Sequence, residues 1–277
     1  MEVIEQRSVC QLREHYEVEK ELAERLRSAC KEERYRLYAS VYDELFQRVA
    51  HHPQNTRKID VERQQLALAA QMKLLRRFLT HDTVFMEIGP GDCSLSRAVA
   101  SLAAKVYAID VSHEITRDSH FPSNFELLLS DGASVPVPRN SINIAYSYQL
   151  MEHLHVDDAK EQVENIYAAL APGGVYVCVT PNRLSGPHDI SKYFDKTSTG
   201  LHLKEYLTQE LADIFRDVGF SKLRAFVGLG GHYLSAPVAP IRCIEKLALV
   251  LPHQFHRWLA AAFPLRCFLG INLVAQK

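Results

Sequence analysis

The residues best suited to chemistry in this chain form a glycine-containing loop after an apolar run. Residues 84–94 read Val-Phe-Met-Glu-Ile-Gly-Pro-Gly-Asp-Cys-Ser, which predicts a buried strand, a tight loop and then a helix. Gly89 and Gly91 let backbone N–H groups approach a ligand closely, at a helix N-terminus whose dipole favours anionic groups. A second predicted strand ends at Asp110, about 20 residues further on, where a carboxylate can accept hydrogen bonds from both ribose hydroxyls. The pattern therefore predicts a site for a ligand that contains adenosine.

Two residues in this loop separate the classes of adenosine ligand. A dinucleotide-binding loop needs Gly or Ala at its third small position, which is Ser94 in this chain. Glu87 comes just before the loop, where its carboxylate would repel a pyrophosphate but stabilise a sulfonium or an ammonium group. Both residues argue against a nicotinamide dehydrogenase and favour a positively charged ligand such as S-adenosylmethionine (SAM).

Four motifs follow one another in the order typical of the class I SAM-dependent methyltransferases. They read Glu87-Ile88-Gly89-Pro90-Gly91, Ala108-Ile109-Asp110-Val111-Ser112, Ser130-Asp131-Gly132-Ala133 and Ala169-Leu170-Ala171-Pro172-Gly173-Gly174. Residues 83–228 thus resemble the small-molecule members of that family, which include quinone and sugar O-methyltransferases. The resemblance implies a doubly wound, Rossmann-like α/β sheet of seven strands with the last one antiparallel. It also implies SAM as the cofactor and S-adenosylhomocysteine (SAH) as the product.

The resemblance assigns cofactor-binding roles residue by residue. The residues it places on the cofactor are Glu87, Gly89, Pro90, Gly91, Asp110, Val111, Asp131, Gly132, Tyr148 and Gln149. It implies that Asp131 holds the adenine amino group, and that the strand end at Tyr148 and Gln149 passes under the transferable methyl. Asn143 departs from the aspartate often found in the family, and we leave it off the cofactor list because an amide carries no charge.

The acceptor side of the site is less clearly marked. Methyl transfer needs a nucleophile held in line with the methyl group and, for a hydroxyl, a base to take its proton. Imidazole suits that task because its pKa is about 6.5. The candidate bases are His153, His188 and His202. The candidate acceptor contacts are Tyr42, Arg57, Tyr193 and Glu205. A structural role is the alternative for each of these residues. Oxygen is the favoured acceptor atom, and we expect no metal.

Composition restricts the acceptor and the compartment. The chain has 277 residues with 32 Lys and Arg against 33 Asp and Glu, so it lacks the basic surplus typical of proteins that bind long nucleic acids. We therefore expect a small-molecule acceptor and no nucleic acid. The six cysteines are scattered without a CxxC pair, which favours reduced thiols in a cytoplasmic protein. No signal peptide or membrane-spanning stretch is expected.

The order of the predicted elements gives a domain plan. Residues 1–80 are expected to form an N-terminal helical extension: one or two solvated helices with a thin apolar stripe, then a further helix after Asp60. Residues 81–277 are expected to form the SAM-binding domain, with a helical insertion at about 228–267. The predicted strands are 84–88, 106–109, 125–129, 142–147, 175–180, 222–227 and 268–275, and the predicted helices between them are 94–103, 157–170 and 208–218.

Alternatives stay open at the level of sequence. The insertion at 228–267 is interpreted as a lid over an apolar acceptor, as a peripheral contact with lipid, or as a packed helical pair. A methyltransferase acting on RNA or on a protein side chain would need a basic patch around the mouth of the site. A non-catalytic SAM-binding module would have a cleft too closed for an acceptor.

Overall fold

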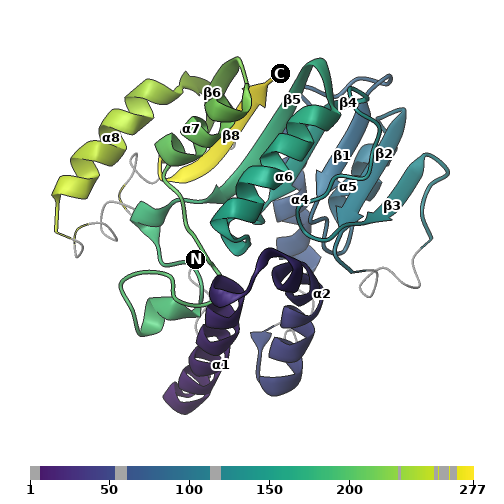
Figure 1. Cartoon of the computed structure of the whole chain (residues 1–277). Coiled ribbons are helices and arrows are strands. Elements are labelled where there is room, and N and C mark those ends of the chain that lie inside the picture. Colours follow the sequence, from purple (N-terminus) through teal and green to yellow (C-terminus); the bar gives the residue numbers. More distant parts are fainter. Residues whose placement is uncertain are drawn as a thin grey trace.

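The core of the protein is one mixed β-sheet with helices on both faces (Figure 1). The computed structural model describes residues 7–53, 61–112, 120–229, 232–252 and 267–277, together with residues 255 and 262. The strand order across the sheet is β3-β2-β1-β4-β5-β8-β6-β7. This arrangement confirms the predicted doubly wound α/β fold, and it has eight strands where seven were predicted.

Five parallel strands form one half of the sheet. They are β1 (Val84–Ile88), β2 (Lys105–Asp110), β3 (Phe125–Leu129), β4 (Ile142–Tyr148) and β5 (Leu170–Pro181). The bounds of β1 and β3 are those predicted, because each is a short apolar run bounded by turn residues. β1 pairs with β2 on one side and with β4 on the other, so the chain reverses its direction of travel across the sheet between these strands. Ligands bind at such switch points, beyond the carboxyl ends of the strands.

The other half of the sheet is antiparallel. β6 (Lys222–Leu229), β7 (His232–Pro237) and β8 (Gly270–Gln276) form it, and β8 lies between β5 and β6, antiparallel to both. The antiparallel last strand is therefore confirmed. The predicted count of seven strands is wrong because β7, expected within a helical insertion, pairs with β6 as a hairpin. The pairing covers backbone groups that β6 would otherwise expose at the sheet edge.

The predicted insertion is helical only after this hairpin. α8 (Val238–Val250) follows β7 directly, and residues 256–261 and 263–266 lie outside the described part of the chain. In the described part of the chain, no helix has the length and apolar character needed to cross a bilayer.

Helices on the two faces of the sheet enclose separate apolar cores. They are α4 (Val61–Leu75), α5 (Ser94–Ala100), α6 (Val156–Ala169) and α7 (Thr208–Val218). Along β1, Phe85 packs with α4 and α5, whereas Met86 and Ile88 pack with α6 and α7. The alternation follows from the two-residue period of a strand, and it buries β1 on both faces.

Two N-terminal helices, α1 (Val9–Ser28) and α2 (Lys31–Arg48), lie at one end of the sheet (Figure 1). They are more deeply packed than the predicted solvated helices, because their apolar residues join the core that contains α6 and α7. Arg34 of α2 donates two hydrogen bonds of 2.6 Å to the Asp158 carboxylate of α6, and Tyr38 adds a third of 2.7 Å. All three side chains are buried, and breaking such a pair typically costs about 3–5 kcal/mol. α2 is thus fixed over the carboxyl end of the sheet.

Candidate active site

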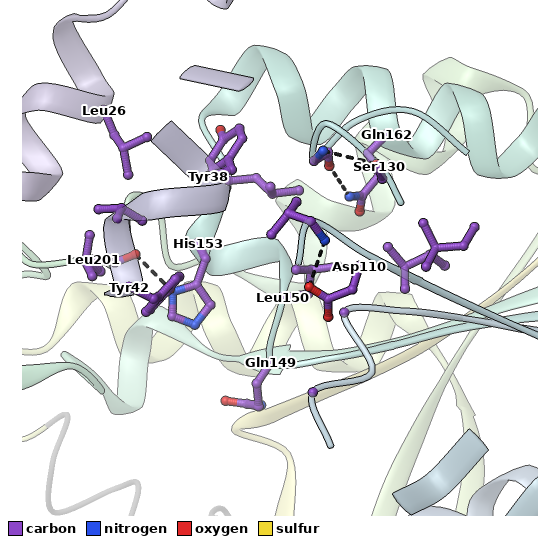
Figure 2. Close-up of a pocket in the computed structure, with 18 residues that line it drawn as sticks. Leu26, Tyr38, Tyr42, Asp110, Ser130, Gln149, Leu150, His153, Gln162 and Leu201 are labelled. Atoms are coloured by element: carbon purple, nitrogen blue, oxygen red, sulfur yellow. Dashed lines mark hydrogen bonds between the residues drawn. The ribbon is translucent and has the colours of Figure 1, made fainter. Parts of the chain in front are cut away.

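A cavity of about 380 Å³ opens at the switch point between β1 and β4 (Figure 2). Its volume lies in the range of roughly 300–1,000 Å³ that is typical of small-molecule sites. Strand ends form one wall and α2 forms another. The predicted site residues that line it are Tyr42, Gly89, Gly91, Asp110, Val111, Gly132, Gln149 and His153.

Two glycines shape this first cavity. Gly89 has a φ of +68°, and a Cβ there would come within 3.1 Å of the Leu150 side chain. Gly132 has a φ of +102°, and a Cβ there would lie 2.6 Å from the Tyr38 ring. Residues other than glycine are strained at such positive φ angles. Tyr38, which sequence analysis missed, therefore packs directly on the turn after β3.

The two predicted carboxylates occupy different positions around the first cavity. Asp110 lines it, and its Oδ1 accepts hydrogen bonds from the N–H groups of Val111 (2.7 Å) and Ser112 (3.2 Å). Asp131 does not line it. The Asp131 Oδ1 accepts from the N–H group of Ser134 at 2.7 Å. Burial raises the pKa of Asp131, but hydrogen bonds from Ser134 and from the N–H of its neighbour outweigh burial and hold that pKa below its ordinary value.

A polar side chain of α6 also faces the first cavity and was missed by sequence analysis. Gln162 donates from Nε2 to the Gly132 carbonyl at 2.6 Å. Its Oε1 is buried, and no described residue donates to it. Such an atom can accept a hydrogen bond from a ligand in the cavity, because an unpaired buried acceptor is costly.

A second cavity, of about 420 Å³, adjoins the first because Gly89 and Gly91 line both. Glu87 and Pro90 line it as predicted, and α4 closes its other side. Glu87 is buried, and this burial raises the pKa of its carboxyl to about 8, although a hydrogen bond from the Ser96 hydroxyl opposes the rise. A bound cation would favour the charged carboxylate.

A third cavity, of about 360 Å³, lies beyond the end of β4 and is lined by His188, Thr180 and Asn182. Tyr148 lines both the second and the third cavity, and Gln149 lines both the first and the third. Gln149 has a φ of +52°, a left-handed conformation that costs a non-glycine residue on the order of 1 kcal/mol. Its N–H donates to the Val179 carbonyl at 2.8 Å, which holds it in this conformation. The three cavities therefore meet around Gly89, Tyr148 and Gln149.

Glu205 holds two of the predicted bases in place. Its carboxylate accepts from the His188 backbone N–H at 2.7 Å, and it lies 3.2 Å from His188 Nδ1 and 2.8 Å from His202 Nδ1. Burial raises the pKa of Glu205, but the two imidazoles outweigh it and bring that pKa well below its ordinary value. Glu205 does not line the third cavity, so it reaches that cavity through His188.

His153 differs from these two histidines. Its Nδ1 lies 3.0 Å from the Leu201 carbonyl and 2.8 Å from the Tyr42 hydroxyl (Figure 2). A carbonyl only accepts, so Nδ1 carries the hydrogen and Nε2 carries the lone pair. Burial lowers the pKa of His153 to about 3, which makes it a poor proton acceptor near neutral pH.

One further predicted acceptor contact is not brought to the three cavities, and another cannot be placed. Tyr193 ends a short 3₁₀ turn (Ile190–Tyr193), is 40% exposed, and lines none of the three cavities. Arg57 lies outside the described residues. Tyr42 is the predicted contact of the N-terminal helices that does line a cavity.

Comparison with known proteins finds similarity to methyltransferases over part of the chain. Residues 86–178 match the model of a methyltransferase domain. The chain is 26% identical over 157 residues to a probable SAM-dependent methyltransferase of Mycolicibacterium smegmatis, covering 54% of this chain and 58% of that protein. It is 27% identical over 138 residues to one of Mycobacterium tuberculosis, covering 49% and 47%. The chain thus spans about half the length of these curated relatives.

Solved structures support the same fold. A SAM-dependent methyltransferase from Mesorhizobium loti superposes with a TM-score of 0.51 at 15% identity, covering 75% of this chain and 98% of that one. One from Archaeoglobus fulgidus gives 0.52 at 16% identity, covering 77% and 94%. The glycine loop after β1, the strand order around the switch point and the matched domain agree: the chain has the fold of the class I SAM-dependent methyltransferases, and its residues 86–178 are similar to a methyltransferase domain.

Proposed function

We propose that the protein transfers the methyl group of SAM to a hydroxyl group of a small molecule. The observation that carries this proposal is the meeting of three cavities around Gly89, Tyr148 and Gln149. The first cavity holds Asp110 and the second holds Glu87. The third is lined by polar side chains and offers separate room for an acceptor.

The first two cavities fit the two ends of SAM. Asp110 would accept hydrogen bonds from the ribose hydroxyls, and the buried Oε1 of Gln162 would accept one from the adenine amino group. The buried carboxylate of Glu87 would pair with the amino group of the methionine end. Asp131 would act through the turn that carries Gly132, because its own Oδ1 is used by backbone N–H groups.

The reaction itself requires little covalent chemistry from the protein. SAM supplies a methyl group on a sulfonium, so the acceptor oxygen forms a bond to that carbon while the carbon–sulfur bond breaks and leaves SAH. His188 lines the third cavity, and its Nε2 would take the hydroxyl proton of the acceptor in place of its present contact, the Ser185 hydroxyl at 3.1 Å. Glu205 orients His188 and would stabilise the imidazolium that forms. Tyr148 and Gln149 would align the acceptor.

A small acceptor is favoured over a macromolecule by the size of the third cavity and by the formal net charge of −1. α8 carries the exposed side chains Leu247, Leu249 and Val250, so a lipid-like acceptor or a lipid surface stays a prediction for this side of the molecule. Hydroxylated aromatics, sugars and lipids are the acceptor classes to screen first.

Calorimetric titration tests the cofactor half of the proposal. SAM and SAH should bind with micromolar affinity, and NAD(H) should not bind. Asp110→Ala should weaken SAH binding by about 100-fold through loss of a charge-assisted contact, whereas His188→Ala should change it less than about twofold. Equal losses in the two variants would sink the division into a cofactor side and an acceptor side.

A methyl-transfer assay with labelled SAM tests the acceptor half. With an accepted hydroxyl compound, His188→Asn should lower kcat by roughly 100-fold or more and leave KM for SAM nearly unchanged. The kcat of Tyr193→Phe, outside the cavities, should stay within about twofold. Transfer to a protein or an RNA in place of any small molecule would contradict the proposal.

A further inference from the structure

A group of possible metal ligands lies behind Thr180 of the third cavity, and we call it the central cluster: Glu152, His153 and His202. One ligand atom from each of the three residues lies within 4.8 Å of the other two. Modest side-chain movement would bring such atoms to a shared cation at about 2.0–2.2 Å. The cluster lies between two cavities, because His153 lines the first and Thr180, which lines the third, hydrogen-bonds Glu152.

Glu152 is the most telling member. Its side chain is fully buried, and its Oε2 accepts a hydrogen bond of 2.8 Å from the Thr180 hydroxyl. Its Oε1 is buried too, and no donor among the described residues reaches it. An unpaired buried carboxylate oxygen is costly. A cation at this oxygen would remove that cost.

The two imidazoles are oriented as metal ligands usually are. His153 Nδ1 donates to the Leu201 carbonyl, and His202 Nδ1 donates to the Glu205 carboxylate. Metal-bound histidines characteristically use their second nitrogen in this way, toward a carbonyl or a carboxylate. Nε2 of both rings makes no hydrogen bond within the described part of the chain. The rings stand edge-to-face with centroids 4.7 Å apart.

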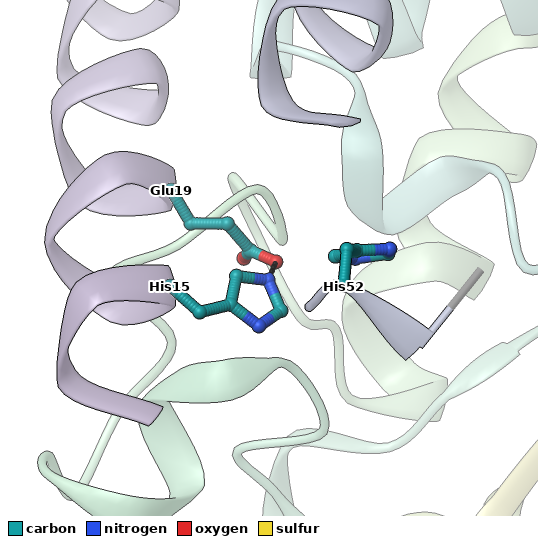
Figure 3. A group of neighbouring side chains, drawn as sticks. All are labelled: His15, Glu19 and His52. Atoms are coloured by element: carbon teal, nitrogen blue, oxygen red, sulfur yellow. Dashed lines mark hydrogen bonds and ion pairs between the residues drawn. The ribbon is translucent and has the colours of Figure 1, made fainter. Parts of the chain in front are cut away.

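A second group of the same composition shows that residue types alone do not make such a site. We call His15, Glu19 and His52 the N-terminal cluster (Figure 3). Arg7 donates to His15 Nδ1 at 2.6 Å, so the His15 Nε2 must carry the hydrogen that it donates to Glu19 at 2.7 Å. Both nitrogens of His15 are occupied, and a guanidinium stands beside the ring. This cluster is unsuited to a cation.

We propose that the central cluster binds one divalent transition-metal ion through Glu152 Oε1, His153 Nε2 and His202 Nε2. Two imidazoles and one carboxylate suit Zn²⁺ or a neighbouring first-row ion, and three protein ligands leave coordination positions open. The three ligands come from two segments that are distant in the sequence, Glu152–His153 and His202. If the proposed function holds, the ion would bind the acceptor oxygen and acidify its hydroxyl, and His188 would take the proton.

Metal titration of the full chain, freed of affinity tags and stripped with a chelator, tests the site without any acceptor. Co²⁺ is the probe because its visible absorption reports nitrogen and oxygen ligands, and Zn²⁺ should displace it. One equivalent of Co²⁺ should bind with a Kd below about 10 μM. Glu152→Gln and His202→Ala should each weaken binding by roughly 100-fold or more, and Thr180→Val by about tenfold through loss of support for Glu152.

His81→Ala is the control, since it removes an exposed histidine that lies outside both clusters. Its Co²⁺ affinity should equal that of the wild type. SAH affinity and the unfolding midpoint are measured on each variant to identify any that misfold. If Glu152→Gln or His202→Ala misfolds, the Co²⁺ affinity of Thr180→Val tests the proposal in its place. Failure of the wild type to bind Co²⁺ at 1 mM, on the order of 100 times the expected Kd, would overturn the proposal, as would wild-type affinity in Glu152→Gln. Cation binding without SAH binding would instead contradict the proposed function.

Discussion

The N-terminal cluster and the central cluster are built from the same residue types, two histidines and one glutamate, yet their hydrogen bonds differ. In the N-terminal cluster a guanidinium and a carboxylate use both nitrogens of His15. In the central cluster each histidine gives one nitrogen to a protein acceptor and keeps the other. The partner on the second nitrogen therefore decides whether such a group is a finished hydrogen-bond network or a site that needs a ligand.

The N-terminal cluster supports the central one. Glu19 Oε2 accepts from the Leu201 N–H at 3.3 Å, and Arg27 donates to the carbonyls of Thr199 and Gly200 at 3.2 Å. These contacts fasten α1 to the segment that carries the Leu201 carbonyl and His202. The first cluster thus contributes stability, and the second uses the geometry that results.

Glu19→Ala should cause the largest change in stability. It leaves the His15 ring and the Leu201 N–H without their acceptor in a buried place, and each loss costs about 1–3 kcal/mol. We expect the free energy of unfolding in urea to fall by roughly 3 kcal/mol. Glu17→Ala, on the exposed side of α1, should change it by less than about 0.5 kcal/mol. Equal losses of unfolding free energy in the two variants would show that the N-terminal cluster has no special structural role.

Arg7→Met tests directly whether the hydrogen-bond partner of His15 distinguishes the two clusters. Removal of the guanidinium frees His15 Nδ1 and takes away a positive charge 2.6 Å from the ring. The N-terminal cluster should then bind a cation, so Co²⁺ stoichiometry should rise from one to two equivalents, with at least about tenfold stronger binding there than in the wild type. Arg7→Lys keeps the charge and should stay at one equivalent. An unchanged stoichiometry in Arg7→Met would show that the partner on the second nitrogen is not what distinguishes the clusters.

His52 gives the N-terminal cluster a pH dependence. Burial, followed by the charges of His15, Arg7 and His51, lowers the pKa of His52 to about 4, although Glu19 opposes them. The pKa is depressed on folding, so the neutral ring contributes stability above about pH 6.5 that is lost as the pH falls to about 4. Screening reduces the full effect of the shift to on the order of 1 kcal/mol. Urea unfolding at pH 7 and at pH 4.5 should show a smaller loss for His52→Gln than for the wild type.

The cofactor half of the site could be predicted because it is local. Gly89, Gly91 and Asp110 follow consecutive strands of one βαβ unit, and the position of a residue at a strand end follows from the hydrophobic pattern alone. The same pattern predicted five parallel strands and three crossing helices, although β5 begins at Leu170, within the turn that was predicted to precede it. β7 was missed because its alternation is weak and it lies between a strand and a helix in an apolar stretch.

The acceptor half could not be predicted because its contacts join distant segments. Glu205 meets His188 and His202 from behind, and Thr180 meets Glu152 across the ends of β5 and β4. Tyr193 is a tyrosine like Tyr42, which lines a cavity, but the turn that carries Tyr193 leaves its side chain outside the cavities. Gln162 offered one signal: it is a polar residue beside Val163 on a helix face whose other buried residues are mostly apolar.

Glu87 and Glu152 are both buried carboxyl groups, and they differ in the partner that each is expected to bind. The smallest effect that we predict concerns the ionisation of Glu87. Burial raises the pKa of Glu87 to about 8, so at pH 7 the ligand-free carboxyl is mostly protonated. Pairing with the ammonium of SAM favours the charged form, so binding should release a proton, and affinity should rise less than tenfold between pH 7 and pH 8. Calorimetry at pH 7 in buffers of different ionisation enthalpy should show a release of slightly under one proton, about 0.9, for the wild type. Glu87→Gln, which cannot ionise, should release none, and equal release in both proteins would mean that Glu87 does not meet the amino group.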